Sequence, residues 1–509
     1  MFRKIIASLD SSDKKDLLSL TGELQQVTYI IAHQWSEYFG TSCLEQGLCD
    51  DSAGCDSHCT AKESENHVNK SRHCQTVENN IENSLLLKTY LVEFCKMCQP
   101  APVSIDEDDP QSHFESHKYQ AAAEQLLICC DLILDQIQLT NNAHVGDYIP
   151  LCGLCSLICE YSEQTRWTSV RLVELGSSIL HKIVQQSNSN SVSHLFTRTC
   201  SDMQCHSDSN KTILSSICEE FSKKFTKENW KNNIPIVYKY KFCVLSLQFP
   251  HVSEYVDKLL PAALLLIDDF EVQYRVIGVQ CIAHLIKNCS KTELQWHGRA
   301  KVIYDALWHL TYNKETELVK VLYPCLFSAL ELLEKPPRES LGPKEYGLYD
   351  KCFSHLITNM ELENNLELRR KYSYHLIEML SLLGITAVRH LPRLLSVIQT
   401  YLDIYDGPAE KSRQHALQAL AVIVVQLWPR IPIHTCTIFQ MLVKFATDIH
   451  LENSLTPLDM KSNLMEKVRE ILLLLKKLNE PIIKKSVMAL DGLELNSEVK
   501  IMLKEIIYS

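Results

Sequence analysis

The residues best suited to chemistry are cysteines and histidines, and 21 cysteines occur in this chain of 509 residues. Eight such side chains gather in one short stretch: Cys43, Cys49, Cys55, His58, Cys59, His67, His73 and Cys74. Both residue types bind zinc, but structural zinc sites pair their ligands two to four residues apart in two knuckles. The gaps between the four cysteines from Cys43 to Cys59 are five, five and three residues. We therefore predict a segment of biased composition here, with no metal and no cofactor.

Two CxxC pairs raise the question of redox chemistry. Cys95 and Cys98 form one pair, and Cys152 and Cys155 form the other, followed by Cys159. A thioredoxin-like motif needs a βαβ setting, and none surrounds either pair. The second group falls at i, i+3 and i+7 among leucines, where thiols serve as small core residues. We predict buried, unreactive cysteines.

The common enzyme motifs are missing from the sequence. No two glycines have GxG spacing, so neither a dinucleotide-binding loop nor a kinase phosphate loop is indicated. The patterns GxxxxGK, HExxH and GxSxG do not occur. We predict a protein that is not an enzyme and has no catalytic residues.

Charged and aromatic residues near predicted turns remain as candidates. Asp268, Asp269 and Arg275 flank a turn, and Arg413 holds the equivalent second-helix position in a later hairpin. In stacked helical repeats, a turn aspartate and a second-helix arginine often bond between neighbours, and we favour this registry role over direct partner binding. The tripeptide Trp428, Pro429 and Arg430 ends a helix. We expect this Trp in the core, although Trp and Arg also dominate interfaces.

The acidic run at 106–109 is the one strong local charge cluster. Its simplest interpretation is a solvated linker. The alternative is a docking segment for a basic groove, extended by phosphorylation of Ser104, which has Glu107 at +3.

The elements that carry these residues are helices. The chain holds only 14 Gly and 17 Pro, far below the roughly 7% and 5% of average proteins. Sandwiches, barrels and doubly wound sheets need glycine-bearing turns, so this composition argues against them. The fold class is therefore predicted as all-α.

The helices are predicted to pair into hairpins. Residues 259–286 read as two antiparallel helices, with Pro261 opening the first and Asp268 and Glu271 at capping-box spacing before the second. A similar unit spans 390–428, with Pro408 at the first position of its second helix. Hairpins recurring at about 40 residues or more are typical of HEAT or armadillo repeats. The prediction is an α-solenoid of irregular antiparallel hairpins.

Composition divides the chain into two regions. Residues 1–240 are predicted as a helical region with disordered insertions near 41–83, 99–112 and 186–210, which are poor in aliphatic side chains or rich in Ser and Asn. Residues 241–509 are predicted as the regular solenoid.

Charge and hydropathy restrict partners and compartment. The formal net charge is −11, and phosphate binding requires a basic face, so direct nucleic-acid binding is not expected. The longest uninterrupted apolar tract, 259–267, is nine residues long, so no membrane association is expected. No secretory signal is visible at the N-terminus. We expect a cytoplasmic protein, with the nucleus as a further location.

Several segments resemble the Tel-two-interacting protein two family. They are Leu259-Leu260-Pro261, Asp268-Asp269-Phe270-Glu271, Tyr274-Arg275 with Gly278, His390-Leu391-Pro392, Asp406-Gly407-Pro408, Ala416-Leu417-Gln418-Ala419-Leu420 and Trp428-Pro429-Arg430. The similarity is clearest between residues 255 and 435, and the total length also fits.

The resemblance implies a non-enzymatic scaffold, the smallest subunit of the triple-T complex. Its partners would be the Tel-two protein and that protein's first interactor. With Hsp90 and the R2TP adaptor, the complex would mature and stabilise the phosphatidylinositol-3-kinase-related kinases mTOR, ATM, ATR and the DNA-dependent kinase. This role would connect the chain to the DNA-damage response and growth signalling. A HEAT-repeat transport adaptor of the importin type is the alternative.

Overall fold

The computed structural model describes residues 120–134, 145–198, 212–339, 345–451, 454–490 and 496–508, apart from residues 122, 133 and 166. The predictions for the Cys/His-rich stretch, the first CxxC pair, the acidic run and the insertions at 41–83 and 99–112 lie outside these residues. The described residues form helices and turns, with one isolated β-bridge between Thr165 and Thr168.

The chain divides into two compact units, Met1–Ala262 and Ala263–Ser509. The division falls inside a helix and lies beyond the boundary expected at residue 240. The reason is that the segment after 240 is bound to the first unit. Tyr240 donates its hydroxyl hydrogen to the carbonyl of Leu259 over 2.7 Å, and the Thr212 and Tyr255 hydroxyls lie 2.8 Å apart.

The described part of the first unit is built from helices of modest length. They are α5 (Val145–Glu160), α6 (Val170–Gln186), α7 (Val192–Thr197), α8 (Ile213–Lys224), α9 (Pro235–Ser246) and the beginning of α10 (Val252–Ile267). Residue types at the helix starts explain several boundaries. Ser169 accepts from the backbone N–H of Leu172, and Thr212 forms a capping box with Ser215.

The predicted disordered insertion at 186–210 is wrong for its first half. Residues 192–197 form α7, which Ser191 caps by accepting from the backbone N–H of His194. Leu195 and Phe196 are buried. Two apolar side chains and a cap are enough to fix this turn of helix within a Ser/Asn-rich stretch. Residues 199–211 lie outside the described part.

The second unit is a stack of antiparallel helical hairpins that continues from the end of α10. Its further helices are α11 (Val272–Asn288), α12 (Lys291–Gln295), α13 (Arg299–Leu310), α14 (Thr316–Leu333), α15 (Leu348–Leu362), α16 (Leu366–Leu383), α17 (Leu391–Asp403), α18 (Lys411–Gln426), α19 (Ile431–Ile449), α20 (Leu458–Leu490) and α21 (Ser497–Tyr508). Short 3-10 turns η3 (Trp296–Gly298), η4 (Pro337–Glu339) and η5 (Gly384–His390) connect some of them. This is the HEAT-like α-solenoid predicted from the sequence.

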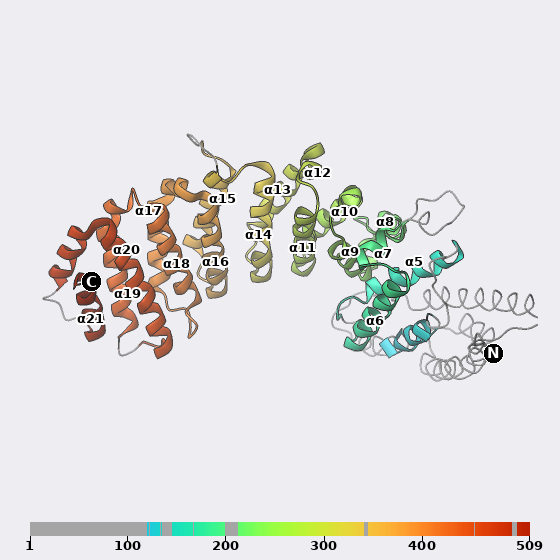
Figure 1. Ribbon diagram of the computed structural model, residues 1–509, viewed down its shortest axis with the longest axis horizontal. Coiled ribbons are helices and arrows are strands. Elements are labelled where there is room, and N and C mark those ends of the chain that lie inside the picture. Colours follow the sequence, from blue (N-terminus) through green and yellow to red (C-terminus); the bar gives the residue numbers. More distant parts are fainter. Residues whose placement is uncertain are drawn as a thin grey trace, which may run out of the picture. The chain divides into compact units, whose positions relative to one another are not determined.

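The hairpins stack in two layers. The second helices α11, α14, α16, α18 and α20 each contact the next, and the first helices α15, α17 and α19 contact one another in the same order. Figure 1 shows α14, α16 and α18 side by side along this unit. Each hairpin thereby covers the apolar face of its neighbour, as expected for repeats that cannot bury their faces alone.

One face of α11 packs against the rest of its hairpin. Tyr274, Ile277, Cys281 and Leu285 are buried along it. Gly278 lies on the same face, and a Cβ atom there would come within 2.9 Å of the carbonyl oxygen of Ala263. A glycine is required because the two helix backbones approach too closely for a side chain.

Three local predictions at helix starts are wrong. Pro261 lies inside α10, which already begins at Val252. The N-cap of α11 is Glu271, and no side chain caps that helix, so the expected capping box is not formed. Pro408 lies in the turn before α18, which begins at Lys411. In each case a spacing rule placed a boundary that tertiary packing moved by several residues.

One helical stretch among the described residues, Leu366–Asp403, is long and apolar enough to cross a membrane by composition. It consists of α16, η5 and α17, and 61% of its most apolar window is buried in the hairpin stack. Core helices pass this test too, so the stretch is weak evidence for a membrane span.

Candidate functional site: two edges of the hairpin stack

The candidate residues lie on two opposite edges of the second unit. The turns inside hairpins, at 268–271, 311–315, 363–365, 404–410, 450–451 and 454–457, form one edge, which we call the turn edge. The connections between hairpins, at 289–298, 334–339, 345–347, 384–390 and 427–430, form the opposite edge, which we call the junction edge. Antiparallel helices stacked in register place the two sets of loops at opposite ends. The two edges differ in how their polar groups are used.

Arg275 links the first two hairpins at the turn edge. Its Nε donates to the backbone carbonyl of Asp269, and its Nη1 donates to Oδ1 of Asn313 in the next turn over 2.8 Å. The buried carboxylate of Asp269 accepts from the backbone N–H of Glu271 over 2.9 Å and so fixes the turn. Arg275 thus contacts the next hairpin, and the carboxylate of Asp269 stabilises the turn of its own hairpin. Asp268, the third member of the predicted group, is exposed.

The next turns continue this pattern. Lys314 pairs with Glu363 of the following turn over 3.3 Å. Arg369 donates to the carbonyl of Glu363 over 3.3 Å and to the carbonyl of Thr400, in the next hairpin, over 3.2 Å. Its guanidinium carbon lies 3.8 Å from the ring centroid of Tyr401. One arginine thereby joins two hairpins by hydrogen bonds and by a cation–π contact.

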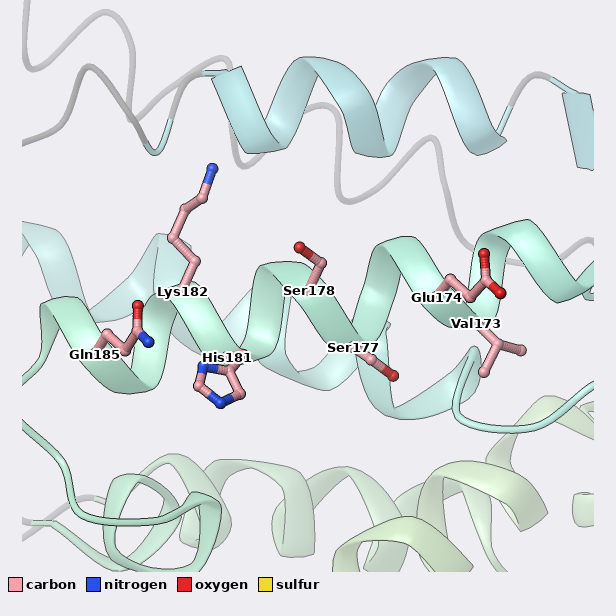
Figure 2. A pocket seen from close by; sticks show the side chains of 7 residues that line it. All are labelled: Val173, Glu174, Ser177, Ser178, His181, Lys182 and Gln185. Carbon is pink, nitrogen blue, oxygen red and sulfur yellow. The ribbon is translucent and has the colours of Figure 1, made fainter.

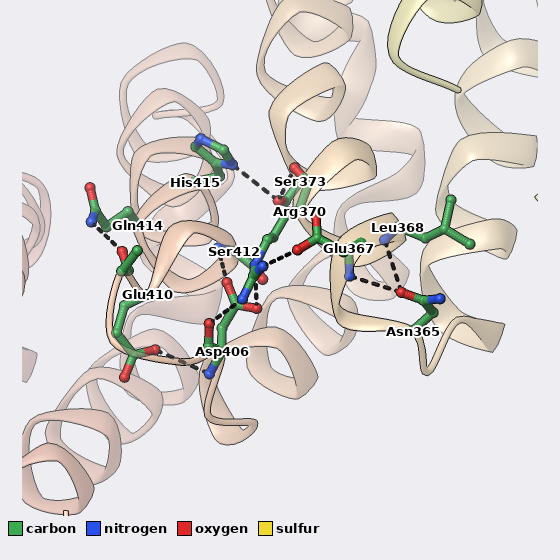
Figure 3. Close-up of polar contacts among 11 residues, drawn as sticks. Asn365, Glu367, Leu368, Arg370, Ser373, Asp406, Glu410, Ser412, Gln414 and His415 are labelled. Carbon is green, nitrogen blue, oxygen red and sulfur yellow. Dashed lines mark hydrogen bonds and ion pairs between the residues drawn. The ribbon is translucent and has the colours of Figure 1, made fainter. Parts of the chain in front are cut away.

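Arg370 makes the adjacent link. It reaches from α16 to the turn before α18, as Figure 3 shows. Its Nε donates to Oδ1 of Asp406 over 2.9 Å, and its Nη2 donates to the backbone carbonyl of Asp406 over 2.6 Å. The other carboxylate oxygen of Asp406 accepts from the backbone N–H of Ser412 over 2.7 Å. Because Asp406 is 1% exposed, this bidentate arrangement neutralises a charge that would otherwise be costly to bury.

Glu410 carries the linkage into the last turn. Its side chain is fully buried, accepts from Arg413 over 2.9 Å and accepts from the hydroxyl of Thr456 over 2.7 Å. The second carboxylate oxygen accepts from the backbone N–H of Asp406 over 3.3 Å. Arg413, predicted as a registry residue, pairs with Glu410 inside its own hairpin, and its guanidinium carbon also lies 5.5 Å from the ring centroid of Phe445 in the next hairpin. Glu410 makes the polar contact between the two hairpins, through Thr456.

The junction edge exposes its candidate residues. Trp428 is 59% exposed, and Pro429 and Arg430 are exposed beside it. The expectation that this Trp lies in the core is wrong. Position 428 lies four residues after the buried Val424, so periodicity alone would continue the buried stripe to it. However, α18 ends at Gln426, and Trp428 lies beyond the C-cap Leu427, where the helical period no longer applies.

Other large apolar side chains are exposed at the successive junctions. They are Trp296 (62%), Tyr346 (61%), Ile385 (56%), Trp428 (59%) and Ile433 (72%). Large exposed apolar side chains that lie close together can mark interaction sites. The turn edge exposes such side chains as well, among them Phe270 (72%), Tyr312 (65%) and Leu455 (74%), so apolar exposure by itself does not distinguish the two edges.

The two edges also carry opposite charge among the described residues. The turn edge and the adjoining helix ends carry six exposed carboxylates and two exposed lysines. The carboxylates are Asp268, Glu317, Glu361, Glu367, Asp403 and Asp459, and the lysines are Lys314 and Lys411. At the junction edge and its adjoining helix ends, seven exposed cations face three carboxylates: Lys287, Lys291, Lys335, Arg338, Arg389, Arg430 and Lys477 against Glu339, Glu345 and Glu480. The junction edge is thus positive on a chain whose net charge is −11.

The first unit holds a buried ion cluster that sequence reasoning missed. Nζ of Lys239 lies 2.5 Å from Glu160 and 3.0 Å from Glu220, and it donates to the hydroxyl of Ser156 over 3.0 Å. Burial raises the pKa of Glu160. Burial also acts to raise the pKa of Glu220, but its pairs with Lys239 and Lys224 outweigh this and lower that pKa to about 2.

This cluster ties three helices together. Ser156 and Glu160 lie on α5, Glu220 on α8 and Lys239 on α9. The sequence does contain a sign of this cluster. Lys239 lies three residues after Ile236 and four before Cys243, so a charged residue occupies the apolar face of a helix and needs buried partners. The cluster is a structural link between the three helices.

The second cysteine group is buried as predicted at two of its three positions, and Cys152 is partly exposed. Cys155 and Cys159 are buried, and burial raises the pKa of the Cys159 thiol well above its usual value. Such a thiol is a poor nucleophile. Within the described residues, no group of three or more His, Cys, Asp or Glu side chains has the arrangement of a metal site.

The first unit also has a shallow surface depression along α6. It has a volume of about 650 Å³ and is lined by Val173, Glu174, Ser177, Ser178, His181, Lys182 and Gln185. Figure 2 shows these side chains spread along one helix. Lys182 is also paired with Asp131 over 2.6 Å. Its polar groups do not converge on one point, so the depression lacks the arrangement of a catalytic or ligand site.

Comparison with solved structures finds helical-repeat proteins. A complex of the yeast protein Kap95p with RanGDP matches 99% of this chain and 51% of its own chain, at 12% identity and a TM-score of 0.48. A structure of yeast importin-β, also Kap95p, matches 83% of this chain and 56% of its own, at 12% identity and a TM-score of 0.39.

Comparison with known sequences is more specific. The model of the Tti2 family matches residues 153–404. The human protein named TELO2-interacting protein 2 is 30% identical over 387 residues, which cover 75% of this chain and 74% of the human protein. The mouse protein of the same name is 31% identical over 250 residues, or 49% of each chain. This extent of similarity, together with the helical-hairpin fold, shows that the chain belongs to the Tti2 family.

Proposed function

We propose that this chain is a non-enzymatic scaffold subunit of a triple-T complex and that it binds the Tel-two protein and that protein's first interactor. The observation that carries the proposal is the 30% identity, over 387 residues, to a human protein named for its interaction with TELO2. A stack of hairpins offers a long surface that can hold another large protein through many contacts.

The finer role follows from the same resemblance. The complex would act with Hsp90 and the R2TP adaptor to mature and stabilise phosphatidylinositol-3-kinase-related kinases, namely mTOR, ATM, ATR and the DNA-dependent kinase. The chain would work in the cytoplasm and also in the nucleus. The exposed apolar row and positive charge of the junction edge support a protein-binding role.

Co-purification of the full chain from cells tests this function. We expect recovery of the Tel-two protein and its first interactor in stoichiometric amounts, and recovery of the kinases in smaller amounts. Depletion of the chain should lower the abundance of these kinases while their messenger RNA stays constant. An importin-type protein purified in the same way controls for nonspecific binding to helical repeats.

Two outcomes would contradict the proposal. One is purification as a stable monomer, without either sibling subunit, from cells that express both. The other is recovery of a Ran-type GTPase together with cargo that bears basic targeting signals, which is the result expected of a transport adaptor.

A further inference from the structure

The corner between α18 and α19 is the most prominent part of the junction edge. Val425, Trp428 and Ile433 are 58%, 59% and 72% exposed, and Arg430 is exposed between them. We call this group the Trp428 corner. It combines a Trp, an Arg and two aliphatic side chains, and Trp and Arg are the residue types that most often carry binding energy at interfaces.

The corner is rigidly built. The backbone N–H of Arg430 donates to the carbonyl of Leu427 over 2.9 Å, and that of Ile433 donates to the carbonyl of Arg430 over 3.3 Å. Pro429 and Pro432 fix two backbone angles in the same turn. Asn479 of α20 donates to the carbonyl of Pro432 over 3.4 Å and supports the corner from behind. A surface ordered in advance loses little entropy when it binds.

The charge around the corner is positive. Arg430 makes no side-chain hydrogen bond or ion pair within the described residues, and Lys477, two residues before Asn479, is also exposed. The nearby carboxylate of Glu480 is already paired with Lys484 over 2.8 Å. A partner therefore gains most by bringing carboxylates to Arg430 and Lys477.

We infer that the Trp428 corner is a docking site for an acidic protein segment that carries bulky apolar side chains, supplied by a subunit of the proposed complex. This inference rests on the proposed function. It specifies which surface of the chain binds the partner and which chemical character the bound segment has. The apolar side chains of the segment cover Trp428 and Ile433, and its carboxylates pair with Arg430. The exposed aliphatic groups favour a protein segment over nucleic acid, whose bases would stack on aromatic rings alone.

Affinity measurements on the full chain with the two co-expressed sibling subunits test the site. We expect Trp428→Ala to raise the dissociation constant at least 30-fold, as for a central interface Trp, and Arg430→Glu to raise it about 10-fold. The matched controls are Leu458→Ala, which removes a side chain that is 80% exposed at the end of the turn edge, and Lys411→Glu. Both controls should stay within threefold of the wild-type value.

The result separates the two proposals. Normal binding by the wild type with unchanged affinity in both corner variants would overturn the docking site and leave the proposed function intact. Failure of the wild type to bind either sibling would overturn both. Thermal unfolding of each variant, which we expect to match the wild type, shows that a loss of affinity is not a loss of fold.

A cross-link identifies the chemistry of the partner. Benzoylphenylalanine placed at Ile433 should cross-link, under light, to one peptide of a sibling subunit in which Asp and Glu outnumber Lys and Arg. A cross-link to a neutral or basic peptide would overturn the inference. So would binding of a 20-nucleotide single strand that Arg430→Glu abolishes, because the corner would then serve nucleic acid.

Discussion

The two edges of the second unit use the same residue types in opposite ways. At the turn edge, charged side chains form hydrogen bonds to neighbouring hairpins; these are the side chains of Arg275, Arg370, Asp406 and Glu410. At the junction edge, Trp428 and Arg430 are exposed to solvent. The turn edge thus joins its hairpins through these contacts. The junction edge, which is also linked where Arg389 and His390 pair with Asp350, exposes Trp428 and Arg430. A substitution at the turn edge should cost stability, and one at the junction edge should cost affinity.

The largest effect on stability is expected from Glu410→Ala. The substitution leaves the buried Arg413 without its carboxylate and removes the acceptor of the Thr456 hydroxyl. Loss of one partner from a buried ion pair costs about 3–5 kcal/mol. Urea unfolding followed by circular dichroism measures this cost. Glu410→Gln keeps an acceptor oxygen and should cost less, and a loss below about 1 kcal/mol in Glu410→Ala would show that this link does not hold the hairpins.

Arg275→Glu should have the next largest effect. It removes the hydrogen bonds to Asn313 and to the carbonyl of Asp269, and it places a carboxylate against two acceptor oxygens. Hydrogen bonds to a charged group contribute about 1.5–3 kcal/mol, so a loss of that size is expected in the same unfolding experiment. Unchanged thermal stability with selective loss of one partner would show that Arg275 is a binding residue and would remove the distinction between the edges.

The sequence predicted one side of this distinction better than the other. The turn residue Asp269 and the second-helix Arg275 follow a spacing shared by stacked helical repeats, so a structural role near this turn could be proposed from the sequence. Asn313, the partner of Arg275 in the next hairpin, could not, because that contact depends on how the hairpins stack. The same holds for the Glu410–Thr456 contact, which joins residues 46 positions apart.

The helices and their buried faces were also predictable, because they follow from a period of 3.6 residues. The hairpins predicted at 259–286 and 390–428 are present as α10 with α11 and as α17 with α18. The exposure of Trp428 was missed because a general preference of Trp for the core was applied to a residue that lies beyond the end of α18 at Gln426. Lys239 was missed because its two carboxylate partners come from separate helices.

Acid should weaken the stack that both edges share. His375 is buried on α16, and its ring centroid lies 5.3 Å from that of Tyr323. Burial lowers the pKa of His375 to about 4, from 6.5 when it is exposed. The unfolded chain therefore binds a proton that the folded chain does not between these values, so the contribution of His375 to stability falls as the pH falls from about 6.5 toward 4.

The size of this effect is about 2 kcal/mol at pH 5 relative to neutral pH. His375→Phe removes the titrating group while it keeps an aromatic ring against Tyr323. Urea unfolding of both proteins across this pH range isolates the effect as the difference between them. Equal pH dependence in the two proteins would show that the pKa of His375 is not lowered in the folded state.

The smallest effect on stability, and the sharpest contrast with the turn edge, is expected from Trp428→Ala and Arg430→Glu. Both side chains are exposed and Arg430 has no ion pair among the described residues, so each substitution should change the free energy of unfolding by less than about 0.5 kcal/mol.

Glu410→Ala should instead lose stability and, in the fraction that stays folded, bind the sibling subunits with nearly normal affinity. A double mutant that combines Glu410→Ala with Trp428→Ala should lose as much stability as Glu410→Ala alone and as much affinity as Trp428→Ala alone. The reason is that the two sites lie at opposite edges and share no contact. Losses that are not additive would mean that the hairpin register and the Trp428 corner are coupled, and the two edges would then act as a single site.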